Sequence, residues 1–209
     1  MFNDRIDAGQ QLCEKLLEYK DRKDVVIMAL PRGGVVPAYV IASGLHLPLE
    51  VTMVKKLGHP TNHEYAIGAV SLTGRIIDNN IGVGEDYIDE ETRNIRKLLK
   101  ERFAMYHGSK PPLSVENKTV IVVDDGVATG KTMIAALELL KEEKPKKIVV
   151  AVPVGPEHTI NLLNNYADEV ICLESDESFY AIGQYYRDFR QVSDDEVKNL
   201  LSRVDHAGT

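Results

Sequence analysis

Tryptophan is absent from the 209-residue chain, and cysteine occurs only twice, as Cys13 and Cys172. Two isolated cysteines form no spaced motif, which argues against a disulfide framework or a cysteine-rich zinc site and predicts buried, reduced thiols. No apolar run approaches the roughly 18 residues that a membrane-spanning helix needs. The N-terminal segment also lacks the apolar centre of a signal peptide, so we expect a cytoplasmic protein that does not bind membranes.

An excess of positive charge is missing as well, because 25 basic residues are outnumbered by 32 acidic ones. Binding to nucleic acid depends on basic groups that neutralise phosphates, so the net charge of −7 predicts no nucleic-acid partner. The sequence contains no internal repeat, low-complexity tract or convincing linker. We therefore expect a single domain that spans residues 1–209.

Short β-rich runs alternate with helical patterns along the chain. Apolar strands are predicted at Val25–Leu30, Leu49–Val54, Val120–Val123, Lys147–Val152 and Glu169–Leu173. Helices are predicted near the N-terminus, with Ile6, Leu12, Leu16 and Leu17 on one face, and at Val35–Ser43, Glu85–Tyr106, Met133–Lys141 and Glu157–Asn165. A hairpin is predicted from Ala66–Leu72 and Arg75–Ile77. Apolar strands separated by helices predict an α/β fold with a doubly wound, mainly parallel five-stranded sheet and helices on both faces.

The most informative segment is Val120–Thr132, which reads VIVVDDGVATGKT. A buried strand runs into Asp124 and Asp125, a loop of small and hydroxyl residues follows, and a helix comes next. Adjacent carboxylates can accept hydrogen bonds from the vicinal hydroxyls of a sugar. The loop can present backbone amides to a phosphate at the positive end of the helix. The segment therefore predicts a ligand that carries both a sugar diol and a phosphate.

Two other interpretations of this segment have to be weighed. Asp-Asp-Gly after a strand is also compatible with an ordinary turn. The ending Gly-Lys-Thr is similar to a nucleotide-triphosphate P-loop, which would indicate a hydrolase or kinase. That motif requires four residues between its glycines, whereas three separate Gly126 from Gly130. The spacing therefore disfavours the P-loop.

A second candidate site is the loop after the first predicted strand, Pro31-Arg32-Gly33-Gly34. Ligands in open α/β sheets collect at the carboxyl ends of the strands. A glycine pair there can present backbone amides to an anion, and Arg32 adds a guanidinium suited to phosphate. If this loop were considered by itself, a tight strand-to-helix turn would be the favoured interpretation. With the Asp124 loop in the same sheet, an anion site is favoured.

Two further segments carry functional groups. Val54–Val70 begins with Lys55 and Lys56 and is interpreted as a flexible, charged flap. Its potential metal ligands are His59, His63 and Glu64, but no further His or Cys cluster completes a metal site. Near the C-terminus, Phe179–Phe189 holds five of the thirteen aromatic residues. They are interpreted either as core or as a platform on which a planar base stacks.

Val120–Thr132 resembles the phosphoribosyl-diphosphate (PRPP) binding motif of type I phosphoribosyltransferases. Between Lys56 and Val70, a Lys-Leu-Gly … Glu-x-Ala-Ile-Gly-Ala-Val pattern is similar to a bacterial group of predicted phosphoribosyltransferases. The likeness extends from about Met28 to about Glu196, and it does not specify the acceptor. It implies the type I phosphoribosyltransferase fold with a small hood, in which flap or hood elements occupy about 54–77 and 174–192.

The resemblance implies transfer of the 5-phosphoribosyl group of PRPP to a nitrogenous base or other small nitrogen nucleophile, with release of diphosphate. Asp124 and Asp125 would hold the ribose hydroxyls. The 5′-phosphate would be wrapped by Gly126, Val127, Ala128, Thr129, Gly130, Lys131 and Thr132. The diphosphate would be bound by Arg32, Gly33 and Gly34. Mg²⁺ would be held mainly by PRPP, with Asp124 as a candidate ligand and no dedicated protein site.

Catalytic roles are expected for Arg32, for Lys56 (or Lys55) at the leaving diphosphate, and for Glu64 as general base or base-orienting group. The small-molecule acceptor would contact Phe179, Tyr180 and Asp188. Ala128 replaces the aspartate that 6-oxopurine enzymes carry at this position, which weakens hypoxanthine or guanine as acceptor.

Three further implications follow from the resemblance. In some members a non-proline cis peptide lies in the diphosphate loop, and Arg32–Gly33 is the candidate bond. Relatives commonly form homodimers. A non-catalytic regulatory protein that keeps the PRPP pocket is the alternative function.

Overall fold

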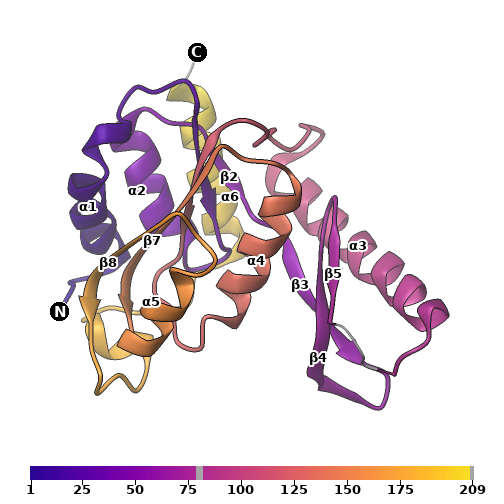
Figure 1. The fold of residues 1–209 in the computed structure, drawn as a ribbon. Coiled ribbons are helices and arrows are strands. Elements are labelled where there is room, and N and C mark those ends of the chain that lie inside the picture. The colour runs from indigo at the N-terminus through magenta and orange to yellow at the C-terminus, as the bar shows by residue number, and fades with distance from the viewer. Residues whose placement is uncertain (79–81, 208–209) are drawn as a thin grey trace.

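The computed structural model describes residues 1–78 and 82–207, and the side chains of these residues except Glu64 and 205–207. Two parts are visible in Figure 1. A larger α/β body contains a five-stranded sheet, and a smaller lobe, here called the hood, contains a three-stranded sheet and one long helix. No helix in the described ranges is long and apolar enough to cross a membrane.

The five strands of the body are all parallel and lie in the order β2-β1-β6-β7-β8. Their bounds are β1 Val25–Ala29, β2 Leu49–Val51, β6 Thr119–Val123, β7 Lys147–Gly155 and β8 Glu169–Ser175. Every residue of β1 and β6 is buried, as expected for central strands covered on both faces. The predicted parallel sheet is confirmed, although β2 ends before Thr52.

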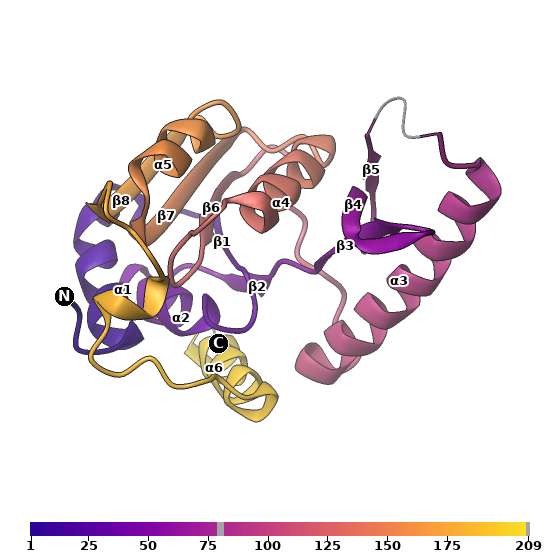
Figure 2. The same ribbon diagram turned by 90° about the horizontal axis from the view of Figure 1, so that it is seen from below.

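Helices cover both faces of this sheet, as Figure 2 shows. They are α1 Arg5–Lys15, α2 Val35–Leu45 and α6 Asp194–Ala207 on one face, and α4 Lys131–Glu142 and α5 Glu157–Leu163 on the other. Short 3-10 turns are η1 Leu17–Tyr19 and η2 Ile182–Tyr185. Alternate residues of β1 enter different cores: Ile27 packs with α1 and α2, whereas Val26 packs with α4.

The N-terminal helix buries a different face from the one that its apolar residues predict. Leu12 and Leu16 are fully buried, but Ile6 and Leu17 are half exposed. Arg5 occupies a buried position in the first turn instead, with 8% of its surface exposed. The helix starts here because the Asp4 side chain caps it, accepting hydrogen bonds from the amides of Ile6 and Asp7.

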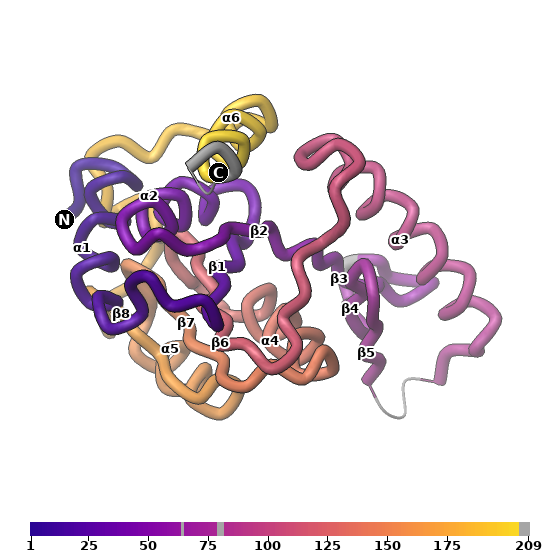
Figure 3. The backbone as a smooth tube through the Cα atoms, turned by 90° about the horizontal axis from the view of Figure 1, so that it is seen from above, coloured from indigo at the N-terminus to yellow at the C-terminus, as the bar shows by residue number. Residues whose placement is uncertain are grey.

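The hood is an antiparallel sheet, and the segment Val54–Val70, interpreted from the sequence as a flexible, charged flap, lies within its first two strands. Its elements are β3 Val54–His59, β4 Asn62–Ser71, β5 Arg75–Ile77 and α3 Glu85–His107. The predicted hairpin is confirmed as the β4–β5 pair. Buried residues of α3, such as Ile95 and Leu99, pack on one face of this sheet against Leu57 and Val70. Figure 3 shows the hood beside the β2 edge of the body.

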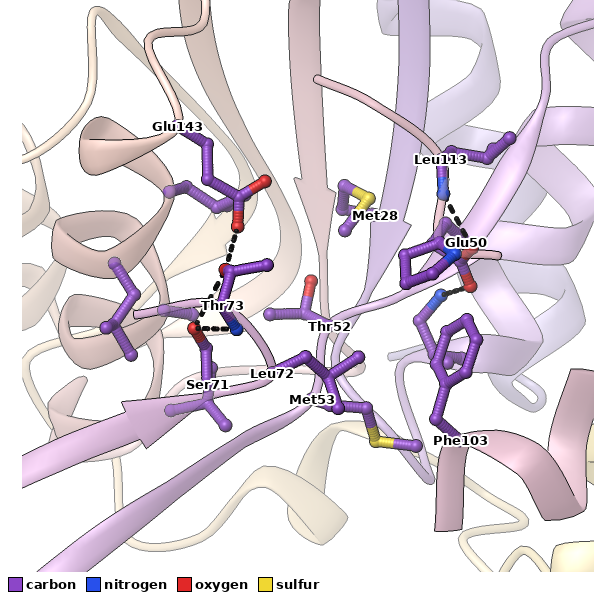
Figure 4. A pocket seen from close by; sticks show the side chains of 16 residues that line it. Met28, Glu50, Thr52, Met53, Ser71, Leu72, Thr73, Phe103, Leu113 and Glu143 are labelled. Atoms are coloured by element: carbon purple, nitrogen blue, oxygen red, sulfur yellow. Dashed lines mark hydrogen bonds between the residues drawn. The ribbon is translucent and has the colours of Figure 1, made fainter. Parts of the chain in front are cut away.

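The hood and the body meet around Glu50 of β2. Its carboxylate is buried, lies 2.7 Å from Nε2 of His107 at the end of α3, and accepts a hydrogen bond from the amide of Leu113. On the other side, the Thr73 hydroxyl donates to Glu143, directly after α4, at 2.8 Å. Figure 4 shows Glu50, Leu113, Thr73 and Glu143 around a hollow between the two parts. The volume of this hollow is about 60 Å³. The junction is therefore held by polar contacts on two sides.

Candidate functional site

Two loops follow the adjacent strands β1 and β6, which pair in register up to Ala29 and Val123. Because the strands are parallel, both loops leave the sheet at the same edge, as the sequence predicted. The Leu30 amide donates to the Val123 carbonyl oxygen at 2.9 Å, which joins the start of one loop to the end of the neighbouring strand. The candidate site is built from these two loops.

The loop before α4 presents a row of unused backbone donors. Among the described residues, the amides of 128–133 have no hydrogen-bond partner. Gly130, at the N-cap, has φ +70°, and no side chain caps the helix. A contact with α5 fixes the loop, because Oγ1 of Thr159 donates a hydrogen bond to the Ala128 carbonyl oxygen at 2.8 Å. A fixed loop with free amides at a helix N-terminus is suited to binding a phosphate.

The β1–α2 loop packs directly onto the acidic pair. Its cis peptide bond joins Pro31 and Arg32, one residue before the bond that the resemblance indicated. A Cβ at Gly33 would lie 2.0 Å from Oδ2 of Asp125, so only glycine fits at this contact. Within the described ranges, the Arg32 guanidinium has no hydrogen-bond or ion-pair partner and remains available for an anion.

The two carboxylates differ in environment, which the sequence does not indicate. Asp125 is buried, and its Oδ2 accepts a hydrogen bond from Nε of Arg5 at 2.7 Å. Asp124 is partly exposed, and its Oδ1 accepts a hydrogen bond from the Asp125 amide at 2.8 Å. Burial and the adjacent Asp125 carboxylate raise the pKa of Asp124 well above its ordinary value. Asp124 is thus the better placed of the two to meet a ligand.

Arg5 is the residue that sequence reasoning missed. Besides Asp125, its guanidinium contacts the Arg190 carbonyl oxygen at 2.8 Å, and its Cζ lies 3.9 Å from the centre of the Phe189 ring. The Tyr186 hydroxyl donates to the Asp125 carbonyl oxygen at 2.6 Å. No pattern in the sequence marks Arg5, because a charged residue in the first turn of an amphipathic helix is expected at the surface.

Lys56 and Lys131 line one groove of about 340 Å³ between the hood and α4. Lys56 pairs across the sheet with Ala69, whose side chain packs toward α4. Lys55 pairs with Val70, which packs toward α3 on the opposite face. The alternation of a strand therefore directs Lys56, and not Lys55, toward the loop before α4. The side chain of Glu64 lies outside the described part of the chain.

The three expected acceptor contacts differ in exposure and in the contacts that they already make. Phe179 stacks on Tyr185 at 5.6 Å between ring centres, whereas Tyr180 is 86% exposed. Asp188 is exposed and accepts a hydrogen bond from the Arg190 amide in its own turn. The segment that contains these residues packs along the N-terminus, where Phe2 and Tyr186 form a β-bridge.

Metal ligands do not cluster in the described ranges, where no group of three His, Cys, Asp or Glu side chains is placed to hold an ion. His59 is engaged locally, since its Nδ1 lies 2.9 Å from the Thr61 hydroxyl. The partly exposed Asp124 carboxylate is an oxygen ligand of the hard type that Mg²⁺ prefers.

Comparison with known proteins agrees with this geometry. Residues 3–190 match the family described as the phosphoribosyl transferase domain. A Mycobacterium tuberculosis (strain H37Rv) protein named as a phosphoribosyl transferase is 38% identical over 209 residues, covering 98% of this chain and 47% of that protein. The protein TT1426 from Thermus thermophilus has a crystal structure with TM-score 0.86 and 36% identity, covering 97% of this chain and 98% of that one.

The chain belongs to the phosphoribosyl transferase domain family, which confirms the resemblance found in the sequence. The five-stranded parallel sheet with a small antiparallel hood is the type I phosphoribosyltransferase fold. The chain spans about half the length of the curated relatives it matches.

Proposed function

We propose that this protein transfers the 5-phosphoribosyl group of PRPP to a small nitrogen nucleophile and releases diphosphate. One observation carries the proposal: the amides of 128–133 have no hydrogen-bond partner among the described residues. The same site contains the partly exposed Asp124 and Arg32, whose guanidinium has no partner among those residues. The chemistry of these groups suits the three parts of PRPP: amides for a 5′-phosphate, a carboxylate for a ribose diol and a guanidinium for a diphosphate. Family membership supports PRPP-dependent transfer in general terms.

The roles of the residues follow from their positions. The loop from Gly126 to Thr132 binds the 5′-phosphate, with amides preorganised by the Thr159 contact. Asp124 accepts hydrogen bonds from the ribose hydroxyls and fixes the sugar. Arg32, together with the amides of Gly33 and Gly34, binds the diphosphate and stabilises the charge that develops as it leaves. Positioning both reactants then supplies much of the rate enhancement.

Lys56 is proposed to contribute a second positive charge over the phosphates. It lies in the same groove as Lys131, on the hood face that is directed toward α4. Glu64, in the adjacent strand, stays our candidate for the group that orients or deprotonates the acceptor. Exclusion of water by the hood would protect the oxocarbenium-like centre from hydrolysis.

Mg²⁺ is the cofactor we propose, since it neutralises the diphosphate and polarises it as a leaving group. Asp124 is the chain's own candidate ligand, because its carboxylate is partly exposed at the end of β6, directly before the phosphate loop. The other oxygen ligands would come from PRPP and water, in line with the preference of Mg²⁺ for retaining water and phosphate oxygens.

For the acceptor we propose a planar nitrogenous molecule, with Tyr180 as the aromatic residue available to stack on it. Its ring is exposed, whereas Phe179 already stacks on Tyr185. One carboxylate oxygen of Asp188 already accepts a hydrogen bond from the Arg190 amide. Ala128 leaves the loop without the carboxylate expected for 6-oxopurines.

The test is a titration of the protein with PRPP in the presence and absence of Mg²⁺, followed by diphosphate release across a panel of nucleobases and small amines. Saturable PRPP binding and diphosphate release with one acceptor class are expected. PRPP binding with no turnover on any acceptor would support the non-catalytic alternative. Absence of PRPP binding would reject both.

A further inference from the structure

A buried cation lies behind the acidic pair. Arg5, in the first turn of α1, is 8% exposed, and its partner Asp125 lies 120 positions along the chain. Burying a guanidinium is costly unless its donors are used. Here Nε donates to Asp125, Nη1 donates to the Arg190 carbonyl oxygen, and the planar group lies over Phe189. The N-terminal and C-terminal segments are thus joined at the candidate PRPP site.

Asp125 is restrained by three separate elements. Arg5 of α1 contacts Oδ2 at 2.7 Å, Gly33 of the β1–α2 loop packs against the same oxygen, and Tyr186 donates to the backbone carbonyl oxygen. The carboxylate is therefore turned toward α1 and the β1–α2 loop. Its neighbour Asp124 stays partly exposed beside the free amides.

We propose that Arg5 is a positioning residue of this site: it holds Asp125 against the β1–α2 loop, so that Asp124 alone presents a free carboxylate to the ribose. This inference rests on the proposed PRPP-binding function. It assigns different roles to the two acids, one structural and one ligand-binding. It also gives the N-terminal helix a role in ligand binding.

The charges around the pair explain why Arg5 matters for Asp124 as well. Asp124 and Asp125 repel each other, and Arg5 is the cation that offsets this repulsion. The other charged or titratable groups near the pair are Tyr186 and, close to Tyr186, Glu174 of β8. The β1–α2 loop adds Arg32. Without Arg5, the Asp125 side chain loses the contact that holds it against the β1–α2 loop, and its orientation relative to Asp124 is no longer fixed.

The experiment compares wild type with Arg5→Met, Arg5→Lys and the control Arg22→Met. Arg22 forms an ion pair with Asp24 at 2.8 Å, but this pair lies on the surface. PRPP affinity with Mg²⁺ is measured by calorimetry at neutral pH. We expect Arg5→Met to weaken binding by about tenfold or more. Arg5→Lys should restore part of the affinity, and Arg22→Met should not change it.

Two further measurements keep the outcome decisive. If Arg5→Met does not fold, the double variant Arg5→Met/Asp125→Asn removes both buried charges, and it should fold and bind PRPP better than Arg5→Met. The amide NMR spectrum of residues 124–133 in ligand-free Arg5→Met tests the positioning role of Arg5 without PRPP. Shifted amides in a protein that binds no PRPP would reject the proposed function but keep the positioning role of Arg5. Unchanged amide shifts and unchanged affinity in Arg5→Met would overturn the inference.

Discussion

Gly33 and Asp125 are in direct contact, since a single added Cβ at Gly33 would lie 2.0 Å from Oδ2 of Asp125. This contact joins the two loops that the sequence singled out as anion sites. It also orients the Asp125 carboxylate toward Arg5. The geometry of the site therefore depends on a close approach that one methyl group would prevent.

Gly33→Ala should destabilise the protein and weaken PRPP binding, because the new methyl group must displace either the loop or Asp125. Overpacking of this kind costs about 1–3 kcal/mol, a fall in melting temperature of about 2–10 °C for a chain of this size. Calorimetry measures both effects. Gly84→Ala is the matched control, because a Cβ there meets nothing within 4 Å. Equal melting temperatures for Gly33→Ala and Gly84→Ala would contradict the close approach of Gly33 to Asp125.

Asp125→Ala should unfold more easily than wild type, because it leaves Arg5 buried without its partner. Breaking a buried ion pair in this way costs about 3–5 kcal/mol. Chemical denaturation measures the change, and Asp24→Ala, which breaks the surface pair with Arg22, should change stability little. Similar losses of stability in Asp125→Ala and Asp24→Ala would show that the buried ion pair contributes no more than the surface pair.

Asp124→Asn should weaken PRPP binding by about 10–100-fold, because it replaces charge-assisted hydrogen bonds to the ribose by neutral ones. The amide oxygen of asparagine can still accept the hydrogen bond from the Asp125 amide, so the loop should keep its shape. Isothermal titration with PRPP and Mg²⁺ gives the affinity. A dissociation constant equal to that of wild type would remove Asp124 from the ribose site.

The same variant should be more stable than wild type at neutral pH. Burial and Asp125 raise the pKa of Asp124 in the folded state, so ionisation of Asp124 opposes folding. For a raised pKa, stability is greatest below the ordinary value and is lost as pH rises through the folded-state pKa. Melting temperatures should thus favour Asp124→Asn at pH 8 and converge with those of wild type toward pH 4. A difference independent of pH would contradict this account.

Lys56→Ala should reduce PRPP affinity by about tenfold, whereas Lys55→Ala should have little effect. Both side chains are exposed and carry the same charge, but only Lys56 lines the groove that contains Lys131. Comparing the two variants therefore distinguishes an effect of the lysine's position from an effect of net charge. Equal effects in a binding assay would show that only net charge matters.

The body of the fold was predictable because its signals are local. The apolar runs of β1, β6 and β7 and the helix pattern of α4 each follow from a few adjacent residues. The hood was predicted in part: β4 and β5 were found, but β3 was assigned to a flap, because Lys55, Lys56 and Gly58 are not typical strand residues. Its strand structure comes from pairing with β4.

In the candidate site, too, local features were predictable and long-range contacts were not. Both phosphate loops were identified from glycines, hydroxyls and acids that lie next to one another in the sequence. Arg5 was missed because its role depends on Asp125, which is 120 positions away. Likewise, the exposure of Tyr180 and the stacking of Phe179 on Tyr185 are set by packing along the N-terminus. Long-range contacts of this kind leave no periodic pattern.

The most direct test of the central claim is an amide NMR titration with ribose 5-phosphate, which carries the phosphate and the diol without the diphosphate. The account predicts saturable shifts at the amides of 128–133, which have no partner among the described residues. Asp124→Asn should weaken this binding. Shifts confined to other parts of the chain, or no saturation, would contradict the account.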